Sequence, residues 1–197
     1  MNRIVIPSAF SFAGCLLAAD PRWDDPLFKQ SVCLVVHHGS GGAVGVMLNR
    51  TLPIDAQALL KQFGAKDGEA GMSSSQMRPQ LFLGGTQSGP VVAMHQRKDL
   101  AEYTSADGVY FAAHVDALKQ LVHDSNSPCR IFIGQAVWEQ GLLEQQFAQG
   151  CWLPLEMNSR VAFETPDRMW VAALRQAGNC LVQAMLGTRS PGNAELN

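Results

Sequence analysis

The sequence is poor in charge: only 16% of its 197 residues are Asp, Glu, Lys or Arg, whereas 47% are hydrophobic. These proportions exclude a disordered or fibrous chain, because such chains have too little apolar surface to bury. No apolar run approaches the ~20 residues needed to span a bilayer. Fifteen basic and 17 acidic residues give a net charge of −2. The lack of a basic excess argues against direct nucleic-acid binding.

The cysteines lack the spacing of a metal site or of a disulfide framework. Their number is odd, no pair is spaced as CxxC, and each lies among apolar neighbours; they are Cys15, Cys33, Cys129, Cys151 and Cys180. This pattern indicates reduced thiols and a cytoplasmic protein. No HxxxH or HExxH motif occurs either. The sequence therefore predicts no metal and no other cofactor.

One feature near the amino terminus points to another compartment. Phe12-Ala13-Gly14-Cys15 resembles a bacterial lipoprotein cleavage site, at which Cys15 would carry a lipid. However, Arg3 is the only early positive charge, Pro7 interrupts the apolar stretch, and Phe12 replaces the usual aliphatic residue. We therefore expect a cytoplasmic protein without a membrane anchor.

Apolar periodicity predicts short strands and helices that interleave without an internal repeat. Strands are predicted at 32–37, 45–49, 81–83, 91–95, 109–113 and 130–133, and helical segments at 27–30, 54–63, 116–123, 141–149 and 166–186. This order favours an α+β or mixed α/β fold in a single domain over residues 1–187. Residues 64–79 have no periodicity and are predicted to form a flexible loop, and residues 188–197 a disordered tail.

The last predicted helix has the clearest start in the chain. Thr165 is expected to cap it, Pro166 to occupy its first position, and Asp167 to lie in the first turn, where the helix dipole favours a negative charge. Apolar residues recur at helical spacing up to Leu186. The four tryptophans, Trp23, Trp138, Trp152 and Trp170, fit core packing better than a ligand pocket.

Two glycine-rich segments are candidates for a phosphate-binding loop. Gly84–Gly89 has the glycine spacing of a P-loop, but Pro90 stands where that motif requires lysine. Gly39–Gly45 joins two predicted strands, as turn-forming glycines commonly do. Turn formation is therefore the preferred interpretation of both segments.

The candidate catalytic residues do not form a recognised pair. Ser40 comes nearest to a GxSxG motif, but His38 occupies the position of its first glycine. On a regular strand, Cys33 and His37 share a face at a separation of about 13 Å, which is too long for a nucleophile and its base. The adjacent His37 and His38 would point to opposite faces and could not hold one metal.

Motifs spread along the chain together resemble the YqgE/AlgH family. In order they are GCLLAADP at 14–21, DPLF at 25–28, Ser31-Val32, GAVGVMLNR at 42–50, FLGG at 82–85, GQAVW at 134–138, LE at 143–144, WL at 152–153, FETP at 163–166, and Trp170. None is diagnostic alone, but their order is specific and covers about residues 10 to 178.

The resemblance implies a single α+β domain, with a bifurcated, mostly antiparallel β-sheet that forms a pseudo-barrel flanked by helices. It also implies a bacterial, cytoplasmic protein of a family for which no enzymatic activity is established. Some members are labelled transcriptional regulators through a link to alginate regulation. Because this chain shows no helix-turn-helix signal and no basic patch, we expect at most an indirect role in transcription.

The chain departs from the family pattern at five positions. Cys15 stands where lysine is usual, Thr51 where a proline often follows Asn-Arg, and Thr86 where GGP is expected. Gln135 and Val137 replace the tyrosine and glycine of a GYAGW-like run. A surface function that depends on these loops can therefore differ in this member.

The leading hypothesis is a non-enzymatic binding or regulatory protein whose partner is a protein or a small molecule. Its recognition surface would be formed by Gly42, Gly84 and Gly85 together with Asn49 and Arg50. Arg50 can hold a carboxylate or phosphate through two hydrogen bonds, or can be a solvated charge at a strand end.

The alternative hypothesis is an enzyme with its site between the two glycine-rich segments. His38 or His95 would act as general base, because histidine titrates near neutral pH. The sequence assigns no other catalytic residue, and it leaves the oligomeric state open.

Overall fold

The computed structural model describes residues 11–53, 80–124 and 126–186, which fold into two five-stranded sheets. Sheet A contains β1 (Leu16–Ala19), β2 (Val32–Gly39), β3 (Gly42–Met47), β9 (Ala136–Trp138) and β10 (Trp152–Leu155), in the order β10-β1-β2-β3-β9. Sheet B contains β4 (Gln80–Leu83), β5 (Val92–His95), β6 (Tyr103–Thr104), β7 (Tyr110–Ala112) and β8 (Cys129–Ile133), in the order β4-β8-β5-β7-β6. All pairs are antiparallel except β4–β8.

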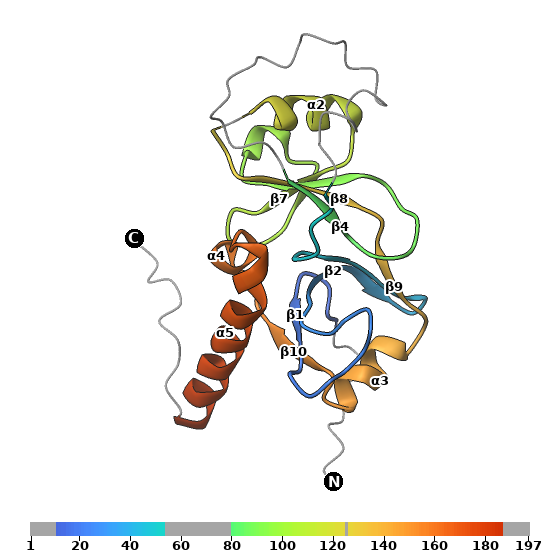
Figure 1. Cartoon of the computed structure of the whole chain (residues 1–197), viewed down its shortest axis with the longest axis vertical. Helices are drawn as coiled ribbons and strands as arrows, with labels where there is room; N and C mark the ends of the chain where they lie inside the picture. The colour runs from blue at the N-terminus through green and yellow to red at the C-terminus, as the bar shows by residue number, and fades with distance from the viewer. Residues whose placement is uncertain (1–10, 54–79, 125, 187–197) are drawn as a thin grey trace.

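Helices cover the outer faces and one flank of the sheets. They are the 3-10 helix η1 (Lys98–Leu100) and the α-helices α2 (Val115–His123), α3 (Leu142–Ala148), α4 (Ser159–Ala162) and α5 (Pro166–Leu186). Figure 1 shows α2 above sheet B, sheet A below sheet B, α3 at the opposite end, and α4 and α5 along one side. No helix in the described part of the chain combines the length and hydrophobicity needed to cross a membrane.

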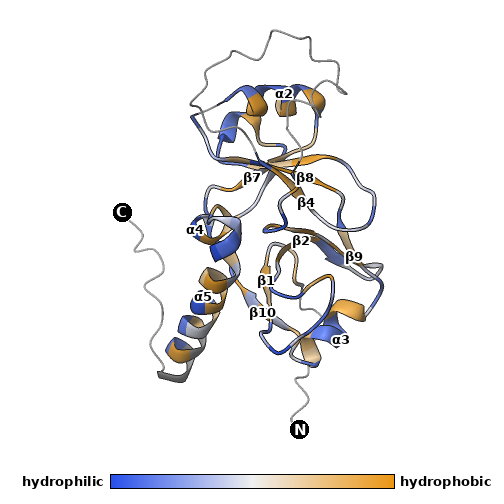
Figure 2. Ribbon diagram, in the orientation of Figure 1, coloured by the Kyte–Doolittle hydropathy of each residue, from blue (hydrophilic) through white to orange (hydrophobic). Residues whose placement is uncertain are grey.

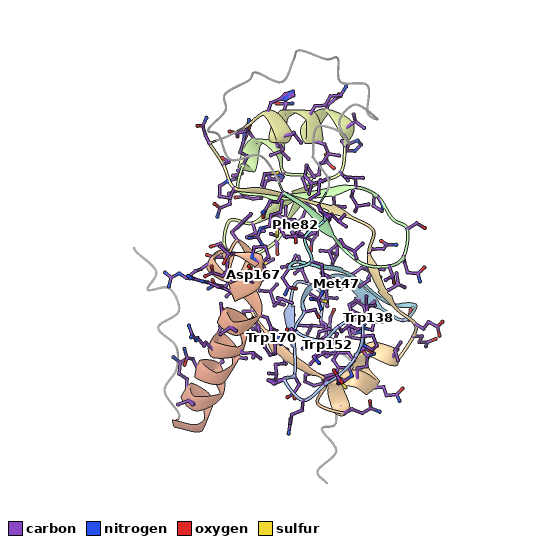
Figure 3. All side chains as sticks on the ribbon, in the orientation of Figure 1. Met47, Phe82, Trp138, Trp152, Asp167 and Trp170 are labelled. Atoms are coloured by element: carbon purple, nitrogen blue, oxygen red, sulfur yellow. The ribbon has the colours of Figure 1, made fainter. Side chains whose placement is uncertain are left out.

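The inner layer lies between the two sheets. Leu34 and Val46 of sheet A belong to the same buried cluster as Phe82 and Phe132 of sheet B, to which α4 and α5 also contribute. Side chains alternate between the faces of a strand, so β8 directs Phe132 to this layer and Ile131 to the layer beneath α2. Figure 3 shows Phe82 at the level between the two sheets.

Each outer face is covered by an amphipathic element. Leu118 and Leu121 of α2 pack on sheet B, and the hydropathy colours of Figure 2 show the apolar side of α2 turned to that sheet. On sheet A, Trp138 and Trp152 form an aromatic cluster with Phe28, and Leu143 of α3 packs in the same cluster. Figure 3 shows the two tryptophans grouped on that side of the molecule. Trp138 and Trp152 are 1% exposed, in agreement with the predicted core role.

The two sheets meet where glycines allow close backbone contact. Met47 N donates to Gly84 O at 2.8 Å, and Gly84 N donates to Ile133 O at 2.8 Å. A Cβ atom on Gly85 would lie 2.1 Å from the backbone of Gln135, so only glycine fits there. The strands thus split into two sheets at this junction, as the resemblance implied. Over the described residues the pseudo-barrel is not closed.

The structure confirms the predicted α+β fold and most predicted elements. The bounds predicted for the strand at 45–49 are wrong, because β3 begins at Gly42 and ends at Met47. Gly42 has a φ of +112°, which favours glycine at that position. Residues 27–30 form the short helical turn that was expected there, with Lys29 N donating to Asp25 O at 2.9 Å and Asp25 Oδ1 accepting from Leu27 N and Phe28 N. The predicted helix over 54–63, the loop over 64–79 and the tail over 188–197 lie outside the described residues.

Candidate functional site

A pocket of about 230 Å³ lies between sheets A and B. Sheet A contributes three valines to its wall, and sheet B contributes one valine and two aromatic residues: Val36, Val44, Val46, Val92, Tyr103 and Phe111. We call it the inter-sheet pocket. Two lining residues, Val46 and Phe111, belong to the inner layer, and Val92 packs against it. The pocket therefore continues that layer toward solvent.

A β-bulge in β2 helps to form the wall of the pocket. The pairing of β2 with β3 shifts between Val35 and His37, which leaves Val36 as the extra residue. Val36 lines the pocket and is 37% exposed. Val137 of β9 is the cross-strand partner of the lining residue Val44 and is 43% exposed. The bulge and the edge strand thus leave an apolar surface beside the pocket.

Glu102 supplies the only carboxylate among the lining residues. Its oxygens accept hydrogen bonds from Ala113 N at 2.9 Å and from His114 N at 3.0 Å. Desolvation opposes ionisation, but the two backbone hydrogen bonds together with the nearby His114 and His95 lower the pKa of Glu102. The carboxylate is therefore fixed in position and ionised at neutral pH.

Gln135 is the second polar side chain with a defined hydrogen bond at the pocket. Its Nε2 donates to Ser88 O at 3.2 Å. Gln135 also pairs with Gln87 through two backbone hydrogen bonds, which fix the segment that joins β8 to β9. This segment also brings Gly134 to the pocket wall.

Asn49 and Arg50 hold the turn before β2. Asn49 Oδ1 accepts from Val32 N at 3.0 Å, and its Nδ2 donates to Gln30 O at 2.9 Å. The Arg50 guanidinium donates to the carbonyl oxygens of Leu27 and Lys29. These contacts fit a structural role, and the binding role predicted for the pair stays a prediction.

The predicted glycines all lie against backbone of the β8–β9 region. A Cβ on Gly42 would lie 2.2 Å from Trp138 O, and one on Gly84 would lie 2.3 Å from Gly134 O. Gly85 meets Gln135 in the same way. None of the three predicted glycines lines the inter-sheet pocket. Their contacts support the turn and packing interpretation of the glycine-rich segments.

His38 uses both ring nitrogens within the fold. Nδ1 accepts from Phe12 N at 3.2 Å, so Nε2 carries the proton and donates to Glu144 Oε1 at 3.0 Å. The His38 side chain is 6% exposed, and Phe12 lies in the buried cluster of Cys33, Trp138 and Trp152 on the outer face of sheet A, which we call the outer cluster. The expectation that Cys33 and His37 lie on the same face of β2 is wrong. The bulge at Val36 shifts the alternation of side chains, so that His38 lies on the face of Cys33.

His95 is completely buried at the end of β5. Its Nδ1 accepts from Arg97 N at 3.2 Å, and burial lowers its pKa. No hydrogen-bond partner for its Nε2 occurs within residues 11–53, 80–124 and 126–186. His95 lies in sheet B and His38 in sheet A, and neither lines the inter-sheet pocket.

Arg130 is a buried cation that the sequence analysis missed. It lies in β8 and is 7% exposed, with its guanidinium 5.0 Å from the centre of the Phe82 ring. It donates to the carbonyl oxygens of Leu48 and Glu164, and so links the end of β3 to the start of α5. Burial lowers its pKa to about 10, which leaves it charged at neutral pH.

The sequence did not indicate the pocket residues either, because a strand valine that lines a pocket has the same sequence pattern as a strand valine in the core. One signal pointed to this region: Gln135 and Val137 are two of the departures from the family pattern. Gln135 lines the pocket and Val137 lies beside it.

The amino-terminal motif belongs to the fold. Phe12 is completely buried, Gly14 N donates to Val35 O at 2.8 Å, and β1 follows directly as an inner strand of sheet A. Cleavage before Cys15 would remove Phe12 from the outer cluster. These contacts make residues 12–19 part of the folded domain.

Comparisons with known proteins agree with this architecture. A UPF0301 protein of Streptomyces avermitilis is 31% identical over 196 residues, which cover 95% of this chain and 96% of that protein. A UPF0301 protein of Streptomyces coelicolor is 30% identical over 197 residues, with the same coverage. The solution structure of the AlgH protein from Pseudomonas aeruginosa has a similar fold, with a TM-score of 0.65 at 23% identity. The alignment covers 97% of this chain and 100% of that one.

A profile of the AlgH-like family matches residues 16–181, which span β1 to α5 and include every residue described at the inter-sheet pocket. The match extends over both sheets and the junction between them. The chain therefore belongs to the AlgH-like family.

Proposed function

We propose that this protein is a non-enzymatic binding protein that holds a small ligand, with a largely apolar body, in the inter-sheet pocket. The observation that carries the proposal is the pocket itself, an opening of about 230 Å³ walled by valines of both sheets and two aromatic residues of sheet B. Core packing normally leaves few voids larger than a water molecule. Concave, mostly apolar sites with a few polar groups are the usual form of small-molecule sites.

The size of the pocket limits the ligand. An apolar cavity of about 150 Å³ is sufficient to bind benzene. The inter-sheet pocket, at about 230 Å³, suits one ring with a short substituent or a short branched chain. It is smaller than the range of about 300–1,000 Å³ that is typical of drug-sized ligands.

The side chains at the pocket fit binding better than catalysis. Its described lining contains no His, Cys, Ser or Lys, so it lacks the Ser–His and Cys–His pairs that most often carry nucleophilic catalysis. The oxygens of Glu102 are engaged by two backbone N–H groups. The two histidines of the enzyme hypothesis lie elsewhere, and their contacts belong to the fold.

A regulatory role follows from the position of the ligand. It would contact both sheets and would lie beside the exposed side chains of Val137 and Tyr103. Occupancy would therefore change a surface that a protein partner can contact, and any effect on transcription would be indirect. We place this function in the cytoplasm, where the five free thiols would remain reduced.

A matched pair of substitutions tests the proposal. Val36→Trp places an indole in the pocket, whereas Val171→Trp makes the same change on α5, away from the lining. Both valines are exposed, so both variants should retain nearly the wild-type melting temperature. The probe is 2-phenylethanol, and its dissociation constant is measured by saturation-transfer NMR. A ligand of this size should bind with about millimolar affinity.

We expect wild type and Val171→Trp to bind the probe equally and Val36→Trp to bind it at least tenfold more weakly. Equal binding by the two tryptophan variants would place the probe elsewhere and overturn the proposal. An absence of saturable binding to wild type would also overturn it.

A further inference from the structure

We propose that the ligand of the inter-sheet pocket is cationic: a single-ring or short-chain amine whose apolar part fills the pocket and whose ammonium group lies beside Glu102. This inference rests on the proposed function and specifies the ligand class of the same site. It follows from the charges and hydrogen bonds of the lining residues.

Charge at the pocket has one sign. Glu102 is the only charged residue in the described lining, which contains no Lys, Arg or His. An ammonium group would meet a carboxylate there, whereas the carboxylate of a fatty or aromatic acid would meet a like charge. At a separation of 4 Å in water, two unit charges interact by about 1 kcal/mol, which corresponds to about fivefold in affinity.

Glu102 is held ready for a cation. Ala113 N and His114 N fix both carboxylate oxygens, so little side-chain freedom is lost when a ligand arrives. A carboxylate has about four lone-pair sites, and these hydrogen bonds leave capacity for a further donor. The ammonium group of an amine is such a donor, and the resulting hydrogen bond would be charge-assisted.

Two neighbouring side chains complement an amine. Tyr103 lines the pocket and is 49% exposed, so its ring is available to a cation at the opening. Gln135 uses its Nε2 on Ser88 O, which leaves its side-chain carbonyl as an acceptor. A neutral ligand of the same shape would gain the apolar contacts but not these electrostatic ones.

Three probes of nearly equal size separate these contributions. They are 2-phenylethylamine, 2-phenylethanol and phenylacetate, which are positive, neutral and negative at pH 7. Dissociation constants are measured by saturation-transfer NMR at 20 mM and 500 mM NaCl. We expect the amine to bind about fivefold more tightly than the alcohol at low salt, and phenylacetate to bind more weakly than both. High salt should shrink the advantage of the amine, because screening weakens exposed charge pairs.

Glu102→Gln removes the charge but retains a carbonyl oxygen that can accept a backbone hydrogen bond. We expect it to abolish the preference for the amine over the alcohol and to leave alcohol binding unchanged. Glu139→Gln is the matched control, since Glu139 is exposed and does not line the pocket. The salt dependence of wild type provides the same test without a variant, should Glu102→Gln unfold.

The outcomes separate the two proposals. Binding of the alcohol with no preference for the amine, or tighter binding of phenylacetate, would overturn the cationic ligand and leave the pocket as a binding site. A preference that persists in Glu102→Gln would overturn the role of Glu102. If none of the three probes binds wild type, the proposed function fails and the cationic ligand fails with it.

Discussion

Asn49 shows how one side chain can take the place of a strand partner. It is half-buried, and its side chain forms hydrogen bonds with Val32 N and Gln30 O at the start of β2. Its neighbour Arg50 satisfies carbonyl oxygens of the preceding turn. The sequence pointed to this pair, but could not show that its partners are backbone atoms some 20 positions away.

Asn49→Ala should lower the free energy of unfolding by about 1–3 kcal/mol, because it leaves Val32 N and Gln30 O without their side-chain partner. Asn179→Ala, on the exposed face of α5, is the control and should change it by less than about 0.5 kcal/mol. Chemical denaturation measures both variants. If Asn49→Ala keeps the wild-type stability but no longer binds a partner protein of the wild type, the structural role is wrong and the predicted recognition role of Asn49 is supported.

His95 should make stability depend on pH. Its pKa is lowered in the folded protein by burial, so the unfolded chain binds a proton more readily below the ordinary histidine pKa of 6.5. Stability contributed by the neutral ring is therefore complete above about pH 6.5 and decreases as the pH falls, with a slope of at most ~1.4 kcal/mol per pH unit.

Melting temperatures between pH 7.5 and 5 check this expectation. His95→Gln should flatten the decrease, because a glutamine can still accept from Arg97 N but does not titrate. His37→Gln, which removes an imidazole at an exposed site, is the control. An identical acid decrease in all three proteins would exclude His95 as its source.

At the scale of elements, the sequence predicted best where local chemistry decides. Helix α5 begins at Pro166 and α2 ends at His123, as predicted. The side chain of Thr165 was expected to cap α5, but its hydroxyl donates a hydrogen bond to Glu164 Oε1. Strands β1 and β10 were not predicted because they are short apolar runs that become strands only by pairing with each other and with β2.

The glycine junction between the sheets should be the least tolerant element. Gly85→Ala would place a Cβ 2.1 Å from Gln135 backbone atoms and should cost about 3 kcal/mol or more. Gly41→Ala meets no atom within 4 Å and should change stability by less than about 0.5 kcal/mol. Denaturant unfolding of the two variants compares these costs. Similar stabilities would mean that the strands can separate at the junction without loss of the fold.

At the scale of the whole molecule, the candidate site arises from the divergence of two sheets. Val36 and Val44 come from one hairpin, but Val92, Tyr103 and Phe111 lie more than 40 residues away in the chain. No local pattern records that these side chains face one another across an opening. The α+β class was predictable from the order of elements, whereas the pocket depends on how far the sheets separate.

The most direct test of the inter-sheet pocket is a methyl NMR titration of the valine-labelled protein with 2-phenylethylamine. We predict that the methyl signals of Val36, Val44, Val46 and Val92 shift in a saturable way, and that those of Val171 and Val182 on exposed parts of α5 do not. Saturable shifts confined to α5, or no shift of the four pocket valines, would contradict the account.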